Sequence, residues 1–213
     1  MAEWFSWLLH IDDKLAEFAQ ANGTLVYGLL FGIIFCETGL VFMPLLPGDS
    51  LLFAAGALAA KPSFELNVYI IWVSLIVAAV LGDTANYHVG YFFGAKVPFI
   101  NPKHIARTQA FYERHGGKTI ILARFVPIVR TFAPFVAGIG KMNYFQFLLY
   151  NVIGGIAWVT LCLFAGYWFG SFAIVEKNFE LVIVGIVFVS VLPMAIELTR
   201  GWLKRKTEPA KPE

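Results

Sequence analysis

The chain has 213 residues, of which 59% are hydrophobic and only 14% are charged. Soluble domains usually carry about 25% charged residues, so this composition excludes a protein whose whole surface is covered by water. The formal net charge of +2 at pH 7 is small, and we expect no nucleic-acid partner.

The first twenty residues predict an amphipathic helix that lies at the membrane surface. Helical spacing places several large apolar side chains near one stripe, namely Trp4, Trp7, Leu8, Ile11, Leu15 and Phe18. Tryptophan prefers headgroup depth. The segment has neither a basic start nor a small-residue cleavage pattern, so we do not expect a cleaved signal. A helix packed on its own protein fits the same stripe.

Long apolar runs then follow one another along the chain. They cover residues 24–60, 66–95, 119–140, 144–172 and 179–199. Each run reaches the roughly 20 residues that one helical span needs. The sequence therefore predicts an all-α integral membrane protein, with one transmembrane domain over residues 21–200 and a basic tail over residues 201–213.

The run 24–60 is too long for one span and contains a strong helix break. Pro44, Pro47, Gly48 and Asp49 interrupt it, because proline removes a backbone donor and glycine permits a turn. Irregular backbone at membrane depth survives only where protein or a water-filled cavity covers it. We expect a re-entrant hairpin of two half-helices here, and a pair of ordinary spans with a surface loop is the alternative.

The second half of the chain repeats this pattern. Pro127 and Pro134 break the run 119–140, and Phe125-x-Pro127 matches Phe42-x-Pro44 at an offset of 83 residues. A second match is longer, since Gly-Tyr-Phe-Phe-Gly at 90–94 corresponds to Gly-Tyr-Trp-Phe-Gly at 166–170.

These matches predict an internal duplication in which each unit is a broken hairpin followed by one transmembrane helix. One such unit crosses the membrane an odd number of times, so two units in series are inverted, which is a transporter design. Chance similarity between aromatic-rich segments is the alternative. A final transmembrane helix over residues 179–199 completes the predicted fold.

The basic residues predict the orientation of the chain in the membrane. They gather in the tail as Arg200, Lys204, Arg205 and Lys206, and in the central linker as Lys96, Lys103, Arg107, Arg114 and Lys118. By the positive-inside bias, the C-terminus and this linker are cytoplasmic. The side on which the N-terminal helix lies is left open.

The candidate functional residues are charges inside the two broken runs. Glu37 and Asp49 are the only acidic or basic residues within 24–60, and Arg124 and Arg130 are the only ones within 119–140. Four such residues would oppose insertion by about 10 kcal/mol if they were left unpaired. Because one run carries only acids and the other only bases, we expect the two hairpins to face each other. Two ion pairs that merely fix the packing are the structural alternative.

Arginine is an informative choice at these positions, because its planar fork binds phosphate oxygens through two parallel hydrogen bonds. A break at Pro127 would bring Arg124 and Arg130 onto one ligand. Desolvation favours the protonated form of a carboxyl, and a neighbouring guanidinium favours the ionised form. We therefore expect Arg124 and Arg130 to bind substrate phosphate and Glu37 and Asp49 to exchange protons.

Two further polar residues within apolar runs are accessory candidates. Asp83 is either a third buried acid or a polar residue at a kink, and Asn151 is a second accessory candidate. Gly154 and Gly155, near Asn151, favour close helix packing. Cys36 and Cys162 have no partner spacing that indicates a disulfide or a metal site, and we expect neither a metal nor a cofactor.

Two stretches of this chain together resemble the signature of the bacterial DedA family. The first is Phe42-x-Pro44-x-Leu46-Pro47-Gly48-Asp49-Ser50 with Glu37 upstream. The second is Arg124-Phe125-x-Pro127-x-x-Arg130-Thr131-x-x-Pro134-x-x-Ala137-Gly138, followed by Asn151 and Gly154. The resemblance covers roughly residues 20–200.

This resemblance implies two opposed re-entrant hairpins and a relation to eukaryotic VTT-domain scramblases. It also implies proton-coupled flipping of undecaprenyl phosphate or a phospholipid across the bacterial inner membrane, with the family's functional residues at Glu37, Asp49, Arg124 and Arg130. We expect membrane lipids and protons as partners, and leave the oligomeric state open.

Other functions fit the sequence less well. A proton-coupled antiporter for small cations or drugs is the alternative, although two arginines would repel a cationic cargo. An intramembrane phosphatase needs a histidine nucleophile, and only His88 lies at a plausible depth, so we do not expect an enzyme.

Overall fold

A computed structural model of the chain describes residues 22–40, 48–94, 117–125, 127–169 and 172. These parts of the chain are helical and contain no strand. Their elements, in chain order, are α3 (Leu25–Gly39), α4 (Gly48–Ala59), the 3-10 turn η1 (Pro62–Phe64), α5 (Val68–Phe93), α7 (Lys118–Ala123), α8 (Pro127–Ile139) and α9 (Tyr144–Phe169).

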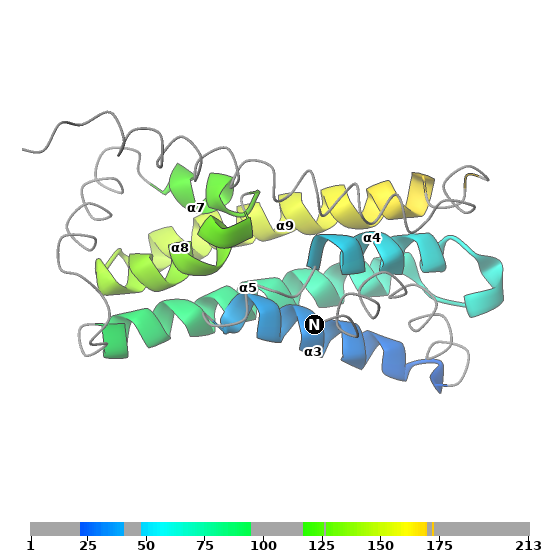
Figure 1. Ribbon diagram of the computed structural model, residues 1–213, viewed down its shortest axis with the longest axis horizontal. Helices are drawn as coiled ribbons and strands as arrows, with labels where there is room; N and C mark the ends of the chain where they lie inside the picture. The colour runs from blue at the N-terminus through cyan, green and yellow to red at the C-terminus, as the bar shows by residue number, and fades with distance from the viewer. Residues whose placement is uncertain (1–21, 41–47, 95–116, 126, 170–171, 173–213) are drawn as a thin grey trace, which may run out of the picture.

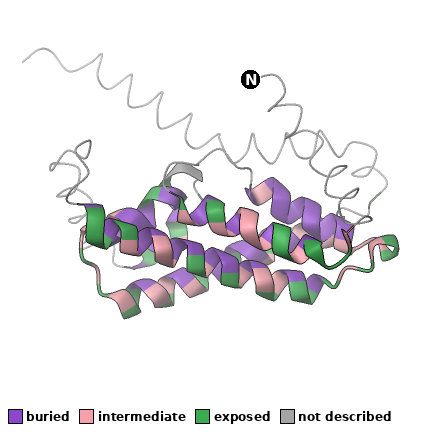
Figure 2. Ribbon diagram, turned by 90° about the horizontal axis from the view of Figure 1, so that it is seen from below, coloured by how far each residue is buried: buried purple, intermediate pink, exposed green. Residues whose placement is uncertain are grey.

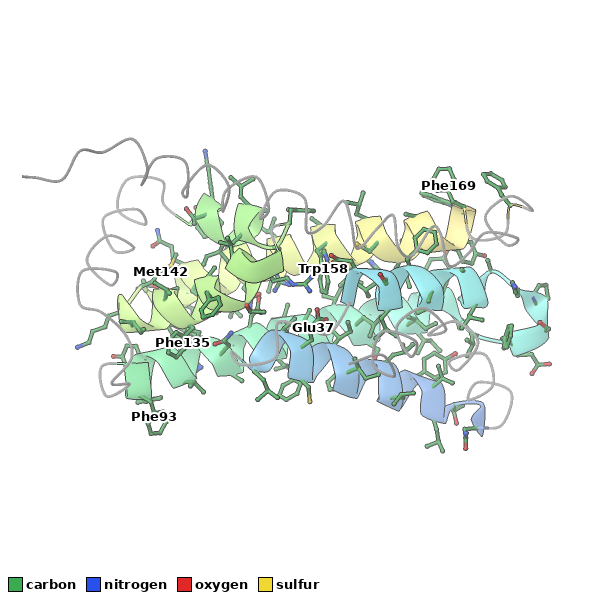
Figure 3. All side chains as sticks on the ribbon, viewed as in Figure 1. Glu37, Phe93, Phe135, Met142, Trp158 and Phe169 are labelled. Atoms are coloured by element: carbon green, nitrogen blue, oxygen red, sulfur yellow. The ribbon has the colours of Figure 1, made fainter. Side chains whose placement is uncertain are left out.

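The helices α5 and α9 form the long axis of the molecule (Figure 1). Each has 26 residues and is therefore about 39 Å long at 1.5 Å per residue, enough to cross a hydrocarbon core of roughly 30 Å. Both are apolar enough to span a membrane. Phe93 and Phe169, at their C-terminal ends, lie at opposite ends of the molecule (Figure 3), so the two helices are antiparallel.

Both long helices begin in the same way. The Asn67 side chain accepts hydrogen bonds from the backbone N–H groups of Tyr69 and Ile70 at 2.9 and 3.3 Å. The Asn143 side chain accepts the equivalent pair from Phe145 and Gln146 at 3.0 and 3.2 Å. An asparagine at this position satisfies backbone donors that the first helical turn leaves unpaired.

The two proline-containing runs are broken as the sequence predicts. The run 24–60 forms α3 and α4, which are separated by residues 41–47, outside the described residues. The run 119–140 forms α7, which ends at Ala123, and α8, which begins at Pro127. With 12 and 13 residues, α4 and α8 are about 18 and 20 Å long and too short to cross a bilayer core.

The short helices pack along the long ones in an alternating arrangement. The helix α4 packs against α9, whereas α8 packs against α5. The helix α3 also lies against α5, and α7 lies against α9. Figure 1 shows α4 and α8 toward opposite ends of the long axis, so each broken run covers one half of the α5–α9 pair.

Glycines allow α4 to touch α9 backbone to backbone. A Cβ atom at Gly56 would meet the carbonyl oxygen of Leu163, and a Cβ atom at Gly166 would meet the carbonyl oxygen of Phe53. Both carbonyls belong to the helix backbone and cannot rotate away. Only glycine therefore permits this approach without a shift of the helices.

The pair α8 and α5 uses the same device. A Cβ atom at Gly138 would meet the carbonyl oxygen of Tyr87, and a Cβ atom at Gly90 would meet the carbonyl oxygen of Phe135. These small residues hold each short helix close to a long one, as helices commonly pack within membranes.

The inner and outer faces of the bundle differ as expected for a membrane protein. Ten of the twelve residues of α4 are buried. Figure 2 shows exposed positions along the helices. Exposed large apolar residues on the long helices include Tyr69, Ile70, Val73 and Val77 on α5 and Phe145, Leu149, Ile153 and Leu161 on α9. Together with the two long apolar helices, this makes the described part of the chain an all-helical structure compatible with a membrane.

Several predicted segments lie outside the described residues. These are the N-terminal amphipathic helix over 1–20, the central linker up to residue 116, the final transmembrane helix over 179–199 and the basic tail over 201–213. They stay predictions from the sequence.

Candidate functional site

The first part of the site is an ion-pair cluster around Arg130. This residue lies on the first turns of α8 and is 5% exposed. Its Nη1 donates a hydrogen bond to Asp49 Oδ1 at 2.9 Å, and its Nη2 donates one to Glu37 Oε1. One guanidinium group thus connects α8 with α3 and with the beginning of α4.

Glu37 also contacts the backbone at the beginning of α4. The Gly48 N–H donates a hydrogen bond to Glu37 Oε1 at 3.1 Å. A Cβ atom at position 48 would overlap the Glu37 carboxylate, so glycine is needed for this approach. The buried Glu37 therefore accepts from both a guanidinium group and a helix N-terminus, which each favour a negative charge.

Trp158 of α9 packs against this cluster. Its indole N–H donates a hydrogen bond to Asp49 Oδ1 at 2.7 Å. Its ring lies 4.7 Å from the Cζ atom of Arg130 and 5.9 Å from the Cζ atom of Arg124. Both distances are within the range of cation–π attraction, so one buried indole contacts both arginines.

The second part of the site surrounds Arg124, which follows the last residue of α7. Its Nη2 donates to the carboxylate of Asp83 on α5 and to the amide oxygen of Asn151 on α9. Arg124, Asp83 and Asn151 are 2%, 1% and 0% exposed. This cluster joins three helices in the interior of the molecule.

The surroundings of Arg124 fix its position. The Asn151 amide nitrogen donates to the carbonyl of Val80 at 3.1 Å, which turns the amide oxygen toward Arg124. A Cβ atom at Gly154 would lie 2.9 Å from Arg124 Cδ and 3.3 Å from the Cα atom of Ile121. The small residue at Gly154 thus allows the close packing of α7 on α9 and also makes room for the arginine stem.

A buried asparagine connects the two broken runs beside the Arg130 cluster. Asn86 of α5 donates to the Thr38 carbonyl at 3.2 Å and to the Thr131 carbonyl at 2.7 Å. These two carbonyls follow Glu37 and Arg130 directly in the chain. Asn86 therefore positions the ends of α3 and α8 that carry this ion pair.

The whole site lies near the middle of the molecule. Figure 3 places Glu37 and Trp158 close together between the two ends of the long axis, which are marked by Phe93 and Phe169. Four of its five ionisable side chains are buried, and the side chain of Asp49 is 21% exposed.

The structure brings together all six residues singled out from the sequence, but it pairs them differently. The expected contact between the acids of one broken run and the arginines of the other is present for Arg130 only. Arg124 instead pairs with Asp83, which lies on an unbroken part of α5. Asp83 is therefore a buried acid and not a polar residue at a kink.

Sequence reasoning missed the roles of Trp158 and Asn86. A tryptophan in the middle of a spanning helix is unusual, because tryptophan prefers the membrane interfaces, and this position was the available signal for Trp158. Asn86 carries the same signal as Asn151, a polar side chain within an apolar run, but its partners are backbone carbonyls of distant segments, which the sequence does not reveal.

His88, the histidine at plausible depth, lies near the end of α5. Its Nδ1 is 2.8 Å from the carbonyl oxygen of Thr84, and its ring contacts the rings of Tyr87, Phe92 and Tyr144. His88 is not among the hydrogen-bond partners of Arg124 and Arg130 described above.

Comparison with known proteins assigns the chain to a family. The VTT domain model matches residues 46–168, which include Asp49, Asp83, Arg124, Arg130 and Asn151. No solved structure matches the chain.

Among curated proteins, Protein DedA of Escherichia coli K12 is 55% identical over 200 residues, which cover 91% of each chain. An uncharacterized membrane protein of Mycobacterium tuberculosis is 41% identical over 198 residues, covering 89% of this chain and 87% of its own. Inner membrane protein YghB of Escherichia coli K12 is 32% identical over 189 residues, covering 84% and 82%. The chain therefore belongs to the DedA family of membrane proteins with a VTT domain.

Proposed function

We propose that this protein is a lipid transporter that moves undecaprenyl phosphate or a phospholipid between the leaflets of the bacterial inner membrane. Arg124 and Arg130 bind the phosphate headgroup, and Glu37 and Asp49 exchange protons, so that transport is coupled to a proton gradient. No chemical step on the lipid is part of this proposal. The protein crosses the membrane several times, with its C-terminus in the cytoplasm.

The observation that carries the proposal is that the two buried arginines have hydrogen-bond donors without partners in the described part of the chain. The Nε and Nη1 groups of Arg124 and the Nε group of Arg130 have no hydrogen-bond partner among the residues that the structure describes. Buried donors are normally satisfied, and guanidinium donors match phosphate oxygens in geometry and charge. The Cζ atoms of Arg124 and Arg130 lie 5.9 and 4.7 Å from the centre of the same indole ring, and this proximity supports the binding of one headgroup by both.

The carboxylates supply a way to release the headgroup. Glu37 and Asp49 both accept hydrogen bonds from Arg130 and therefore compete with phosphate for the same donors. Protonation of these carboxyls weakens their hold on Arg130 and favours phosphate binding, whereas deprotonation favours release. This competition is the proposed link between proton movement and lipid movement.

We further propose that the chain consists of two inverted repeats. An offset of 76 residues relates Asn67 to Asn143, which cap the long helices. The same offset relates Gly90 and Tyr87 to Gly166 and Leu163, and an offset of 82 relates Phe53 and Gly56 to Phe135 and Gly138. The contact Gly56–Leu163 is thus the counterpart of Gly138–Tyr87. The antiparallel course of α5 and α9 supports inversion.

In this architecture, α4 and α8 are half-helices of two re-entrant hairpins. Both are too short to cross the membrane, and they lie toward opposite ends of the α5–α9 pair. Asp49 begins one half-helix and Arg130 lies near the beginning of the other, and their hydrogen bond joins them. Such a meeting of half-helices near the midplane suits a transport site.

Reconstitution into liposomes tests the proposal. Wild-type protein should move headgroup-labelled undecaprenyl phosphate or phospholipid between leaflets, and a side-by-side assay of the two probes identifies the cargo. Arg130→Lys should reduce the rate, because a point charge replaces a bidentate fork. Arg124→Ala and Arg130→Ala should nearly abolish it, whereas Lys118→Ala, which removes an exposed cation, should not.

Undiminished transport in the two alanine variants would contradict a role for the arginines in headgroup binding. An imposed pH gradient tests the coupling separately. Equal rates with and without the gradient would show that the protein scrambles lipids passively and would remove the proton-exchange role of Glu37 and Asp49.

A further inference from the structure

The site contains one more acidic residue than the two broken runs. The runs contain two acids and two arginines, which balance. The structure adds Asp83, so that the site contains three carboxylates and two guanidinium groups in the described part of the chain. Arg130 has two carboxylate partners, whereas the carboxylate partner of Arg124 is Asp83.

This difference gives Asp83 a special position when a headgroup binds. If a phosphate oxygen replaces one carboxylate at Arg130, the guanidinium group keeps the other. A phosphate that binds the Nε and Nη1 donors of Arg124, which are unpartnered among the described residues, shares the single positive charge of this guanidinium group with Asp83, so the Asp83 carboxylate loses part of its charge compensation and faces a second anion. A buried charge that loses its partner is strongly unfavourable, and a carboxylate avoids this cost by taking up a proton.

We infer that Asp83 takes up one proton when a phosphate headgroup binds Arg124, so that the lipid and the proton enter the site together. The proton comes from bulk water and converts the Asp83 carboxylate to the neutral acid, while Arg124 keeps its charge and pairs with the phosphate. This inference rests on the proposed function and adds a proton-binding residue outside the two broken runs.

The surroundings of Asp83 support this role. Its Oδ1 atom is buried and has no hydrogen-bond partner within the described ranges, so a proton there displaces no existing bond. The charged groups that act on it are Arg124 from the end of α7, Arg130 from α8 and Glu37 from α3. Asp49 on α4 faces Arg130, and α9 contributes the neutral Asn151. With Arg124 engaged by phosphate, the negative charge of the phosphate disfavours a negative charge on Asp83.

Asn151 keeps Arg124 in place during phosphate binding. Its amide is anchored on the Val80 carbonyl and accepts from Arg124 whatever the protonation state of Asp83. Phosphate binding therefore adds a partner at Arg124 but needs no movement of α7 away from α9.

Proton uptake on lipid binding tests the inference. Purified protein in weakly buffered detergent solution is titrated with a short-chain phosphatidylglycerol, and a pH dye reports the protons bound. A phosphodiester is the right probe, because a phosphate monoester has a second ionisation near pH 6 and would take up protons itself. Wild-type protein should bind at least one proton per lipid that occupies the site.

Two variants separate Asp83 from other carboxyls. Asp83→Asn keeps an acceptor for Arg124 but cannot titrate, so its uptake should be lower than the wild-type uptake by about one proton per bound lipid. Glu65→Gln neutralises an exposed carboxyl and should keep the wild-type value. Equal uptake in wild type and Asp83→Asn, or lipid binding without uptake in wild type, would overturn the inference. Absence of lipid binding in wild type would instead contradict the proposed function.

Infrared difference spectroscopy on wild-type protein provides an independent measurement if Asp83→Asn does not fold. Lipid binding should produce the carbonyl band of a protonated carboxyl. The band should shift when aspartate is labelled with carbon-13, and it should persist in Asp49→Asn. No band, or a band that shifts only with labelled glutamate, would assign the proton elsewhere and overturn the inference.

Discussion

The indole N–H of Trp158 donates a hydrogen bond to Asp49 Oδ1 at 2.7 Å, the same oxygen that accepts from Arg130. The ring of Trp158 also contacts the Arg130 guanidinium group face-on at 4.7 Å. A residue of α9 thus holds both members of an ion pair formed between α4 and α8. This relationship makes the tryptophan part of the site as well as of the helix packing.

Replacement of Trp158 should separate these two contributions. Trp158→Phe keeps an aromatic face but loses the hydrogen bond to a charged acceptor, which should lower the free energy of unfolding by roughly 1.5–3 kcal/mol. Trp158→Leu also loses the cation–π contacts and should cost more. Thermal unfolding of detergent-purified protein measures both. Trp168→Phe, at an exposed tryptophan of the same helix, is the control, and an equal effect there would contradict the assignment.

Asp83 and Arg124 should be coupled in a double-mutant cycle. Arg124→Gln leaves Asp83 buried without its ion-pair partner and should lower stability by about 3–5 kcal/mol. The double variant Asp83→Asn/Arg124→Gln leaves only neutral amides and should be more stable than Arg124→Gln alone. Thermal midpoints of the wild type, the two single variants and the double variant complete the cycle. Simple additivity would show that the ion pair contributes no coupling.

The close approach of α4 and α9 makes a packing prediction. Gly56→Ala places a methyl group against the Leu163 carbonyl and should destabilise the protein by roughly 1–3 kcal/mol, as overpacking does. Gly32→Ala, in α3, has open space at the added Cβ atom and should be neutral or slightly stabilising. Heating followed by size-exclusion chromatography compares the two. Similar losses in both variants would show that the substitution acts through something other than this contact.

The beginning of α4 offers a test of the Glu37 position. Gly48→Ala places a methyl group where the Glu37 carboxylate lies, so the carboxylate must leave Gly48 N–H and change its contact with Arg130. We expect strongly reduced lipid transport in liposomes. Ser50→Ala, in the same helical turn, removes a buried hydroxyl that has no partner among the described residues and should transport normally. Normal transport in Gly48→Ala would show that the observed Glu37 contacts are not needed.

Much of the fold could be predicted because its causes are local. Apolar runs of spanning length follow from composition, and the breaks near Pro44 and Pro127 follow from the missing donor of proline. The ends of α5 at Phe93 and α9 at Phe169 agree with the two matched Gly-Tyr-aromatic-Phe-Gly segments.

The sequence by itself determined the class of the protein and singled out the charged residues of the two broken runs. Charges in apolar runs are costly wherever the helices pack, so Glu37, Asp49, Arg124 and Arg130 stand out without any structure. Only the tertiary structure decided which acid pairs with which arginine. The partner of Arg124 depends on how α5, α7 and α9 are rotated against one another, which glycine contacts such as Gly154 against Arg124 set. Hydropathy carries no information on that rotation, and the pairing of Arg124 with Asp83 therefore appears only in the folded molecule.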